Sequence, residues 1–90
     1  MIETLTKTET KVEHLRLYKI ILYNDDKYPM VLVVKYLMLI FRYGIEESTR
    51  IMEEAHRTGR SIVIITHLER AELYLEQMTS VGLIGSIEEA

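Results

Sequence analysis

The chain has 90 residues, of which 48% are apolar and 28% are charged, and its formal net charge is −3. This length predicts one small domain, and the apolar content is high enough for a packed core, which argues against a disordered chain. There is no cysteine, so disulfides and thiolate metal sites are excluded, and the acidic balance argues against a nucleic-acid partner.

The histidines and the apolar runs further limit the class of protein to which the chain can belong. The three histidines are scattered without metal-ligand spacing, so we expect neither a metal nor another cofactor. No apolar run reaches the roughly 20 residues that a membrane span needs. The polar N-terminus does not resemble a signal peptide. We therefore expect an intracellular, soluble protein.

Residues 1–10 are rich in Thr, Glu and Lys and show little periodicity. We expect residues 1–14 to form a flexible arm and residues 15–90 to form one folded domain. A frayed end without any role is an equally good interpretation of the arm.

A strand followed by a helix is predicted around a short polar segment. Residues Leu15 to Tyr23 alternate and are rich in β-forming side chains, which predicts the central strand of a sheet. Residues 24–28 predict a turn, in which Asp26 would cap the next helix and Pro29 would occupy its first turn. That helix is expected to end at Gly44.

The predicted helix that begins near Met30 is apolar nearly all round. One face carries Met30, Val33, Val34, Leu37, Met38 and Phe41, and four further apolar residues lie largely off that face: Val31, Leu32, Leu39 and Ile40. Either both sides are covered within the domain, or one side is a contact surface.

The rest of the chain predicts two more helices and two short strands. A helix is expected over residues 46–58, stopped by Gly59, and a buried strand over residues 61–65. Thr66 and Glu69 have the spacing of a capping box for a helix from Leu68 to about Thr79, and residues 82–87 predict the last strand. The order is β-α-α-β-α-β, and three strands make a small sheet, so the fold class is α+β.

The polar segment suits a particular kind of ligand. Asn24, Asp25 and Asp26 offer hydrogen-bond acceptors next to an apolar wall, and a peptide N-terminus with a bulky first residue carries a cation beside an apolar side chain. From the residues alone, a plain turn is an equally good interpretation of these three. A structural role for His56, and gap filling in the core by Met30 and Met52, are even favoured.

Two motifs together resemble the ClpS adaptor family. The first joins Tyr18 to Leu22 (YKIIL), Asn24-Asp25-Asp26 and Pro29-Met30, and the second is Met52-x-x-x-His56-x-x-Gly59. The closing residues 83–90 are also similar to the family's C-terminal strand. The resemblance covers about Tyr18 to Ala90, and the combination is specific, whereas either motif alone would be weak.

The resemblance implies a fold and a function. The fold would be three helices against a small three-stranded antiparallel sheet. ClpS adaptors bind proteins whose first residue is Leu, Phe, Tyr or Trp, and they deliver them to an AAA+ unfoldase of the ClpA or ClpC type, which feeds the ClpP protease. Such an adaptor is not an enzyme. It would act in the bacterial cytoplasm or in the stroma of a bacterium-derived plastid.

The resemblance also implies roles for single residues. Asn24, Asp25 and His56 would hold the α-amino group, with Asp26 in the same motif. The hydrophobic side-chain pocket would be formed by Tyr28, Met30, Val33, Met52, Ala55 and Leu83. Tyr28 stands where the family commonly has a small Thr, so a phenol there would narrow the mouth or stack on the ligand. Unfoldase docking would involve Glu69 and Tyr74, and the arm would be engaged during delivery.

Two other functions stay open. A protein-interaction module of the same fold without N-terminal recognition would use the extra apolar face of the helix after Met30. An enzyme would use Asp25, Asp26 and His56 for acid–base chemistry. The sequence shows no nucleophile elbow and no glycine-rich phosphate loop to support the enzyme.

Overall fold

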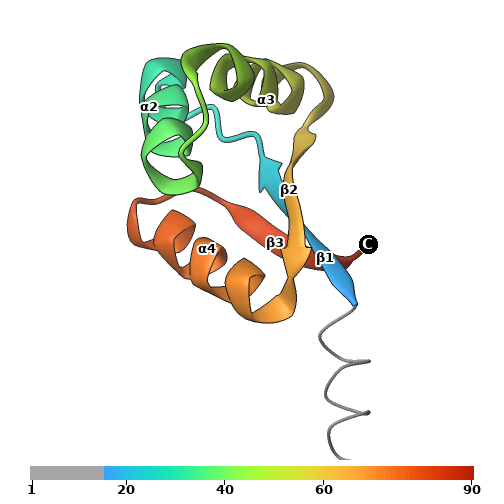
Figure 1. Ribbon diagram of the computed structural model, residues 1–90. Helices are drawn as coiled ribbons and strands as arrows, with labels where there is room; N and C mark the ends of the chain where they lie inside the picture. Colours follow the sequence, from blue (N-terminus) through green and yellow to red (C-terminus); the bar gives the residue numbers. More distant parts are fainter. Residues whose placement is uncertain (1–15) are drawn as a thin grey trace, which may run out of the picture.

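The computed structural model describes residues 16–90, and its elements follow the predicted order. The predicted arm, residues 1–14, lies outside the described residues. Three helices and a three-stranded antiparallel sheet are present, which confirms the α+β class. The elements, labelled in Figure 1, are β1 (Leu17–Tyr23), α2 (Met30–Phe41), α3 (Ile45–Thr58), β2 (Arg60–His67), α4 (Leu68–Ser80) and β3 (Gly85–Glu89).

The sheet has the strand order β2-β1-β3, so β1 is central, as its apolar sequence predicts. Its middle residues Ile20, Ile21 and Leu22 are buried. Ile20 and Leu22 join the core that the helices contribute, which includes Leu37 of α2 and Ile51 of α3. Each such side chain contributes about 1.5–3 kcal/mol on burial, so this core is what holds the helices to the sheet.

Strand β2 is longer and more exposed than the predicted buried strand of residues 61–65. Ser61 and Val63 are buried, but Ile62 and Ile65 are 43% and 52% exposed. The prediction of full burial was wrong because β2 is an edge strand, and only alternate side chains of a strand can face the same side.

Helix α2 begins and ends differently from the prediction. Its N-cap is Pro29 without a side-chain cap, and the Asp26 carboxylate instead accepts a hydrogen bond from Asn24. The left-handed residue at its end is Arg42 (φ 61°), whereas Gly44 is extended and precedes α3. The early reversal lets the Tyr43 ring stack on Phe41, with 5.9 Å between ring centroids.

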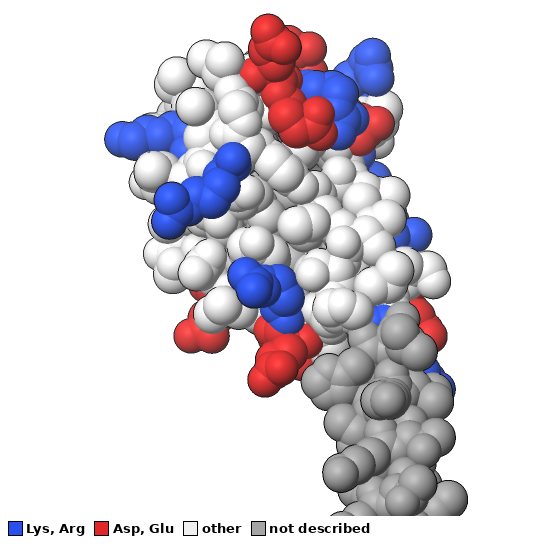
Figure 2. All heavy atoms as spheres, in the orientation of Figure 1, with Lys and Arg blue, Asp and Glu red and all other residues white. Residues whose placement is uncertain are grey.

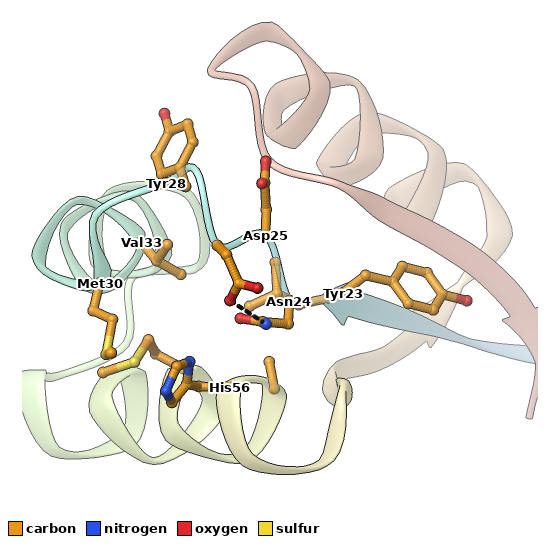
Figure 3. Close-up of a pocket in the computed structure, with 11 residues that line it drawn as sticks. Tyr23, Asn24, Asp25, Tyr28, Met30, Val33 and His56 are labelled. Carbon is orange, nitrogen blue, oxygen red and sulfur yellow. Dashed lines mark hydrogen bonds between the residues drawn. The ribbon is translucent and has the colours of Figure 1, made fainter.

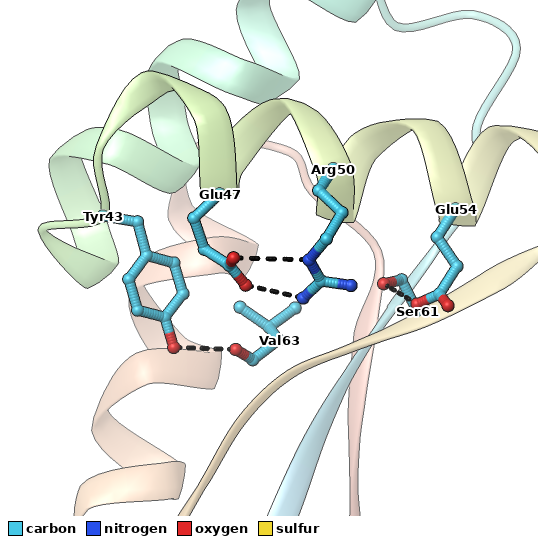
Figure 4. A network of polar contacts seen from close by, with 6 residues as sticks. All are labelled: Tyr43, Glu47, Arg50, Glu54, Ser61 and Val63. Atoms are coloured by element: carbon cyan, nitrogen blue, oxygen red, sulfur yellow. Dashed lines mark hydrogen bonds and ion pairs between the residues drawn. The ribbon is translucent and has the colours of Figure 1, made fainter.

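Tyr43 also ties the helices to the edge strand. Its hydroxyl donates to the backbone carbonyl of Val63 at 2.8 Å, and the Ser61 hydroxyl donates to Glu54 of α3 at 2.5 Å (Figure 4). On the same surface Arg50 pairs with Glu47 at 2.6 Å, which lowers the pKa of the Glu47 carboxyl through this hydrogen bond. The hydrogen bonds to Val63 and from Ser61 fix α3, the helix that carries His56, against β2.

The last helix and strand also differ in detail from the prediction. The N-cap of α4 is His67 and makes no side-chain cap bond, so the predicted capping box of Thr66 and Glu69 was wrong. Thr66 belongs to β2, where it pairs with Tyr18. Strand β3 begins at Gly85 because Gly82 (φ 86°) and Leu83 form a turn, in which the Leu83 N–H donates to Met78 at 2.9 Å.

No helix within residues 16–90 has the length and apolar character required to cross a membrane.

Candidate functional site

A small cavity lies where the loop after β1 faces α2 and α3, and its volume is about 70 Å³ (Figure 3). Every residue predicted to hold the α-amino group or to form the side-chain pocket lines it, except Leu83. Leu22 and Tyr23 line it as well, and their position directly before Asn24 in the strand was the signal that could have indicated them. The lining residues are Leu22, Tyr23, Asn24, Asp25, Asp26, Tyr28, Met30, Val33, Met52, Ala55 and His56.

Backbone hydrogen bonds bring the two motifs of the sequence together. The Asn24 N–H donates to the carbonyl of Gly59 at 3.0 Å. Gly59 is the left-handed C-cap of α3 (φ 97°), and its own N–H donates to Ala55 at 2.8 Å. The end of β1 is therefore fastened to the last turn of α3, and this turn carries His56 toward the polar segment.

The polar end of the cavity is built from Asn24, Asp26 and His56. The Asn24 amide donates to the Asp26 carboxylate at 2.9 Å, which leaves the amide oxygen and the second carboxylate oxygen free of this bond (Figure 3). His56 lies on α3 across the cavity, and its side chain is exposed. These three groups can each accept a hydrogen bond from a cation.

Asp25 has a different arrangement from Asp26. Its carboxylate accepts the backbone N–H of Lys27 at 3.0 Å, and its carbonyl accepts the N–H of Tyr28 at 3.0 Å. These bonds form the turn that the sequence predicts for this segment. In Figure 3 the Asp25 carboxylate points away from His56, although the residue still lines the cavity.

The apolar end of the cavity combines fixed and movable side chains. Ala55 and Met52 of α3 are 3% and 9% exposed, and Val33 of α2 is half-buried. Met30 sits at the rim with 47% exposure. Leu83 is 5% exposed and belongs to the hydrophobic core, so it lies in the support behind the site rather than in the lining.

Tyr28 lines the upper side of the cavity as drawn in Figure 3, with its ring pointing away from Met30 and His56. Its hydroxyl donates to the carbonyl of Val81, and its ring lies 6.2 Å from that of Tyr36. Desolvation, with smaller contributions from Tyr36 and Asp25, raises the pKa of the Tyr28 phenol. The phenol therefore stays protonated at neutral pH and keeps its role as a donor.

The two residues predicted for unfoldase docking lie on α4, away from the cavity. Glu69 is exposed in the first turn of the helix. Tyr74 is half-buried, and its ring packs on Phe41 with 4.6 Å between centroids, so part of its role is structural. Within residues 16–90 no three His, Asp or Glu side chains are grouped so as to hold a metal ion.

Comparison with known proteins finds the same family by sequence and by structure. Residues 6–83 match the family model described as ATP-dependent Clp protease adaptor protein ClpS. The ClpS of Synechococcus elongatus is 40% identical over 90 residues, covering 97% of this chain and 95% of the relative. The ClpS of Gloeobacter violaceus is 37% identical over 87 residues, covering 96% and 94%.

A solved structure agrees with these relatives. Agrobacterium tumefaciens ClpS2 bound to L-phenylalaninamide superposes with a TM-score of 0.81 at 31% identity, and covers 83% of this chain and 98% of that one. The family match spans most of the chain, and the sequence motifs meet around one cavity. The chain therefore belongs to the ClpS family of ATP-dependent Clp protease adaptor proteins.

Proposed function

We propose that this adaptor binds polypeptides whose first residue is Leu, Phe, Tyr or Trp, and delivers them to a ClpA- or ClpC-type AAA+ unfoldase for degradation by ClpP. The observation that carries the proposal is one cavity with hydrogen-bond acceptors at one end and apolar side chains at the other. A free α-amino group next to a bulky side chain has the complementary chemistry. Since the relatives above are bacterial, the bacterial cytoplasm is the proposed place of action.

The polar end suits an α-ammonium group. An ammonium has three donors and no acceptor, and Asn24, Asp26 and His56 supply an amide oxygen, a carboxylate and a ring nitrogen. The geometry favours Asp26 over Asp25 as the carboxylate: each uses one oxygen in a hydrogen bond, but the Asp25 carboxylate points away from His56. In this proposal Asp25 shapes the turn and adds negative charge nearby.

The apolar end suits the side chain of the first residue. Burial of a Leu or Phe side chain contributes about 1.5–3 kcal/mol, and each hydrogen bond to the ammonium contributes a similar amount. After the entropic cost of ordering the ligand and the site is subtracted, the summed free energy of binding corresponds to affinities of roughly micromolar or tighter. The ligand of Agrobacterium ClpS2, L-phenylalaninamide, has this combination of an α-amino group and an apolar side chain.

Docking to the unfoldase is proposed to use the exposed part of α4 around Glu69, with Tyr74 supporting it from the half-buried side. Figure 2 shows acidic side chains beside α4 and over α3, each with basic side chains next to them, and a largely uncharged area between the two groups. The α4 group includes Glu69, Glu72 and Glu76, all exposed. A partner surface with basic residues would complement it.

Fluorescence anisotropy with short peptides that differ only in residue one tests N-terminal recognition. Peptides starting with Leu, Phe, Tyr or Trp are expected to bind, whereas those starting with Ala or Ile, and an acetylated Leu peptide, bind far more weakly. Acetylation removes the charge and two donors. His56→Ala should weaken binding of the free peptides toward the level of the acetylated one. Equal binding of the acetylated and free Leu peptides would overturn the proposal.

A second candidate function, a protein-interaction module, is favoured by the outer face of α2. Val31 and Leu39 are 75% and 61% exposed there, and between them lies Lys35, also exposed. This candidate predicts that Asn24→Ala and His56→Ala leave partner binding intact while Leu39→Ser weakens it. In a pull-down with purified unfoldase N-terminal domain, weaker binding of Leu39→Ser would favour this candidate, whereas unchanged binding of Leu39→Ser would favour docking through α4.

A further inference from the structure

We propose that Tyr28 sets the first-residue preference of this site by closing its apolar cavity, so that a leucine side chain binds better than an aromatic one. The inference rests on the proposed function, because it concerns the order of preference within the four first residues named there. It assigns to Tyr28 the part of a fixed wall rather than that of a stacking platform or a movable lid.

Tyr28 is held at both ends of its side chain. Its backbone N–H donates to Asp25 at 3.0 Å within the turn, and Pro29 follows it in the chain. Its hydroxyl donates to the carbonyl of Val81, which lies 53 positions away in the turn after α4. Moving the ring from this position would break this bond and expose a half-buried aromatic side chain.

Gly82 provides the space against which the ring packs. A Cβ atom built on Gly82 would lie 3.2 Å from Cε2 of Tyr28, which is tighter than an ordinary contact. The ring thus fills the room that the glycine leaves and has little freedom to retreat toward the turn. On its other side it faces Tyr36, at 6.2 Å between centroids.

The other side chains that line the cavity differ in how far they can move when a ligand binds. Met52 and Ala55 are buried in α3 and supported by the core. Met30 is 47% exposed and has an unbranched, flexible side chain, so it can adjust to the ligand. Adjustment at the rim does not deepen the cavity, whereas the position of the Tyr28 ring limits its width.

The volume of the cavity decides between the ligands. It is about 70 Å³, whereas an apolar cavity of roughly 150 Å³ is known to admit a benzene ring. A leucine side chain has four carbon atoms and a phenylalanine side chain has seven, of which six form a rigid ring. An aromatic side chain therefore fits this volume less completely than leucine, and we expect the aromatic ligands to bind roughly 3- to 10-fold more weakly than leucine.

The experiment compares dissociation constants of Leu-, Phe- and Trp-starting peptides by anisotropy, for the wild type, Tyr28→Ala, Tyr28→Thr and Tyr28→Phe. The wild type is expected to bind the Leu peptide most tightly. In Tyr28→Ala and Tyr28→Thr the preference should shift toward the aromatic peptides by about tenfold or more. Tyr28→Phe keeps the ring and should shift the preference less than either.

Tyr43→Phe is the matched control, because Tyr43 also donates its hydroxyl to a backbone carbonyl but lies outside the cavity. Its ratio of Phe to Leu affinity should equal that of the wild type. Aromatic peptides that bind the wild type as tightly as leucine, or a ratio unchanged by both Tyr28→Ala and Tyr28→Thr, would overturn the inference alone. If no free peptide bound the wild type, the proposed function would fall with it. Circular dichroism shows which variants are folded, and the wild-type ratio is decisive even if a variant is not.

Discussion

Replacing Asp26 by Asn is expected to weaken binding of a free N-terminus much more than the same replacement at Asp25. Asp26 already accepts one hydrogen bond from Asn24 at 2.9 Å and can offer its second oxygen to an ammonium across from His56. Asp26→Asn keeps the shape of the side chain but removes the charge. The two substitutions therefore separate a carboxylate that contacts the ligand from one that shapes the loop.

The magnitude follows from the number of charge-assisted contacts. A hydrogen bond between two charged partners is worth about 1.5–3 kcal/mol, so Asp26→Asn should raise the dissociation constant roughly 10- to 150-fold. Asp25→Asn keeps an oxygen that can accept the Lys27 N–H, so the turn is retained. Only the nearby charge is lost, and we expect an effect of about threefold or less, which salt screens further.

Anisotropy with a Leu-starting peptide at low and at physiological salt measures both effects. The ratio of the two variants is more informative than either value, because both carry the same change in net charge. A larger loss in Asp25→Asn than in Asp26→Asn would refute the assignment made here and would return the contact to Asp25. Similar thermal unfolding of the two variants would show that the loop is intact in both.

Three further predictions concern stability. Ser48 is fully buried, and its hydroxyl has no hydrogen-bond partner among residues 16–90, so Ser48→Ala should stabilise the fold by about 1 kcal/mol in urea denaturation; a loss of stability would contradict this account. Gly59 has φ 97°, so Gly59→Ala should destabilise by about 1 kcal/mol, whereas Gly44→Ala, at φ −71°, is the matched control and should change the midpoint much less. Desolvation, with a smaller effect of Glu47, raises the pKa of the Tyr43 phenol in the folded chain. The stability that the Tyr43 hydroxyl contributes is therefore fully present below the usual pKa of about 10, and it is lost as the pH rises through the higher pKa of the folded state. Tyr43→Phe should therefore be less stable than the wild type at pH 7, and the difference should shrink above about pH 10 in pH-dependent unfolding; a constant difference would argue against the role of the hydroxyl.

Element order and type could be predicted from the sequence because they depend on local patterns. The apolar run before Asn24, the helical spacing after Met30, and Gly59 at the end of α3 all lie within a few residues of the features they determine. The detailed ends could not be predicted. Arg42 rather than Gly44 reverses the chain, because the contacts of Tyr43 with Phe41 and Val63 decide where α2 stops.

Most of the residues that line the cavity could be predicted, because they belong to the two sequence motifs. Leu83 is the exception, since nothing local distinguishes a residue in the core behind a cavity from one in its wall. The different arrangements of Asp25 and Asp26 could not be predicted either. Adjacent side chains in a turn point in directions that depend on which donor each carboxylate accepts, here the Lys27 backbone N–H for Asp25 and the Asn24 side-chain amide for Asp26.

The sequence by itself determined the α+β class, the order of the elements and the two motifs that identify the family, because each is written in neighbouring residues. Only the tertiary structure decided that Asn24 is fastened to Gly59 and that Tyr28 reaches Val81. Both contacts join segments more than 30 positions apart, and their geometry depends on how the helices pack on the sheet. The width of the cavity is set by such distant contacts, so it could be found only in the folded chain.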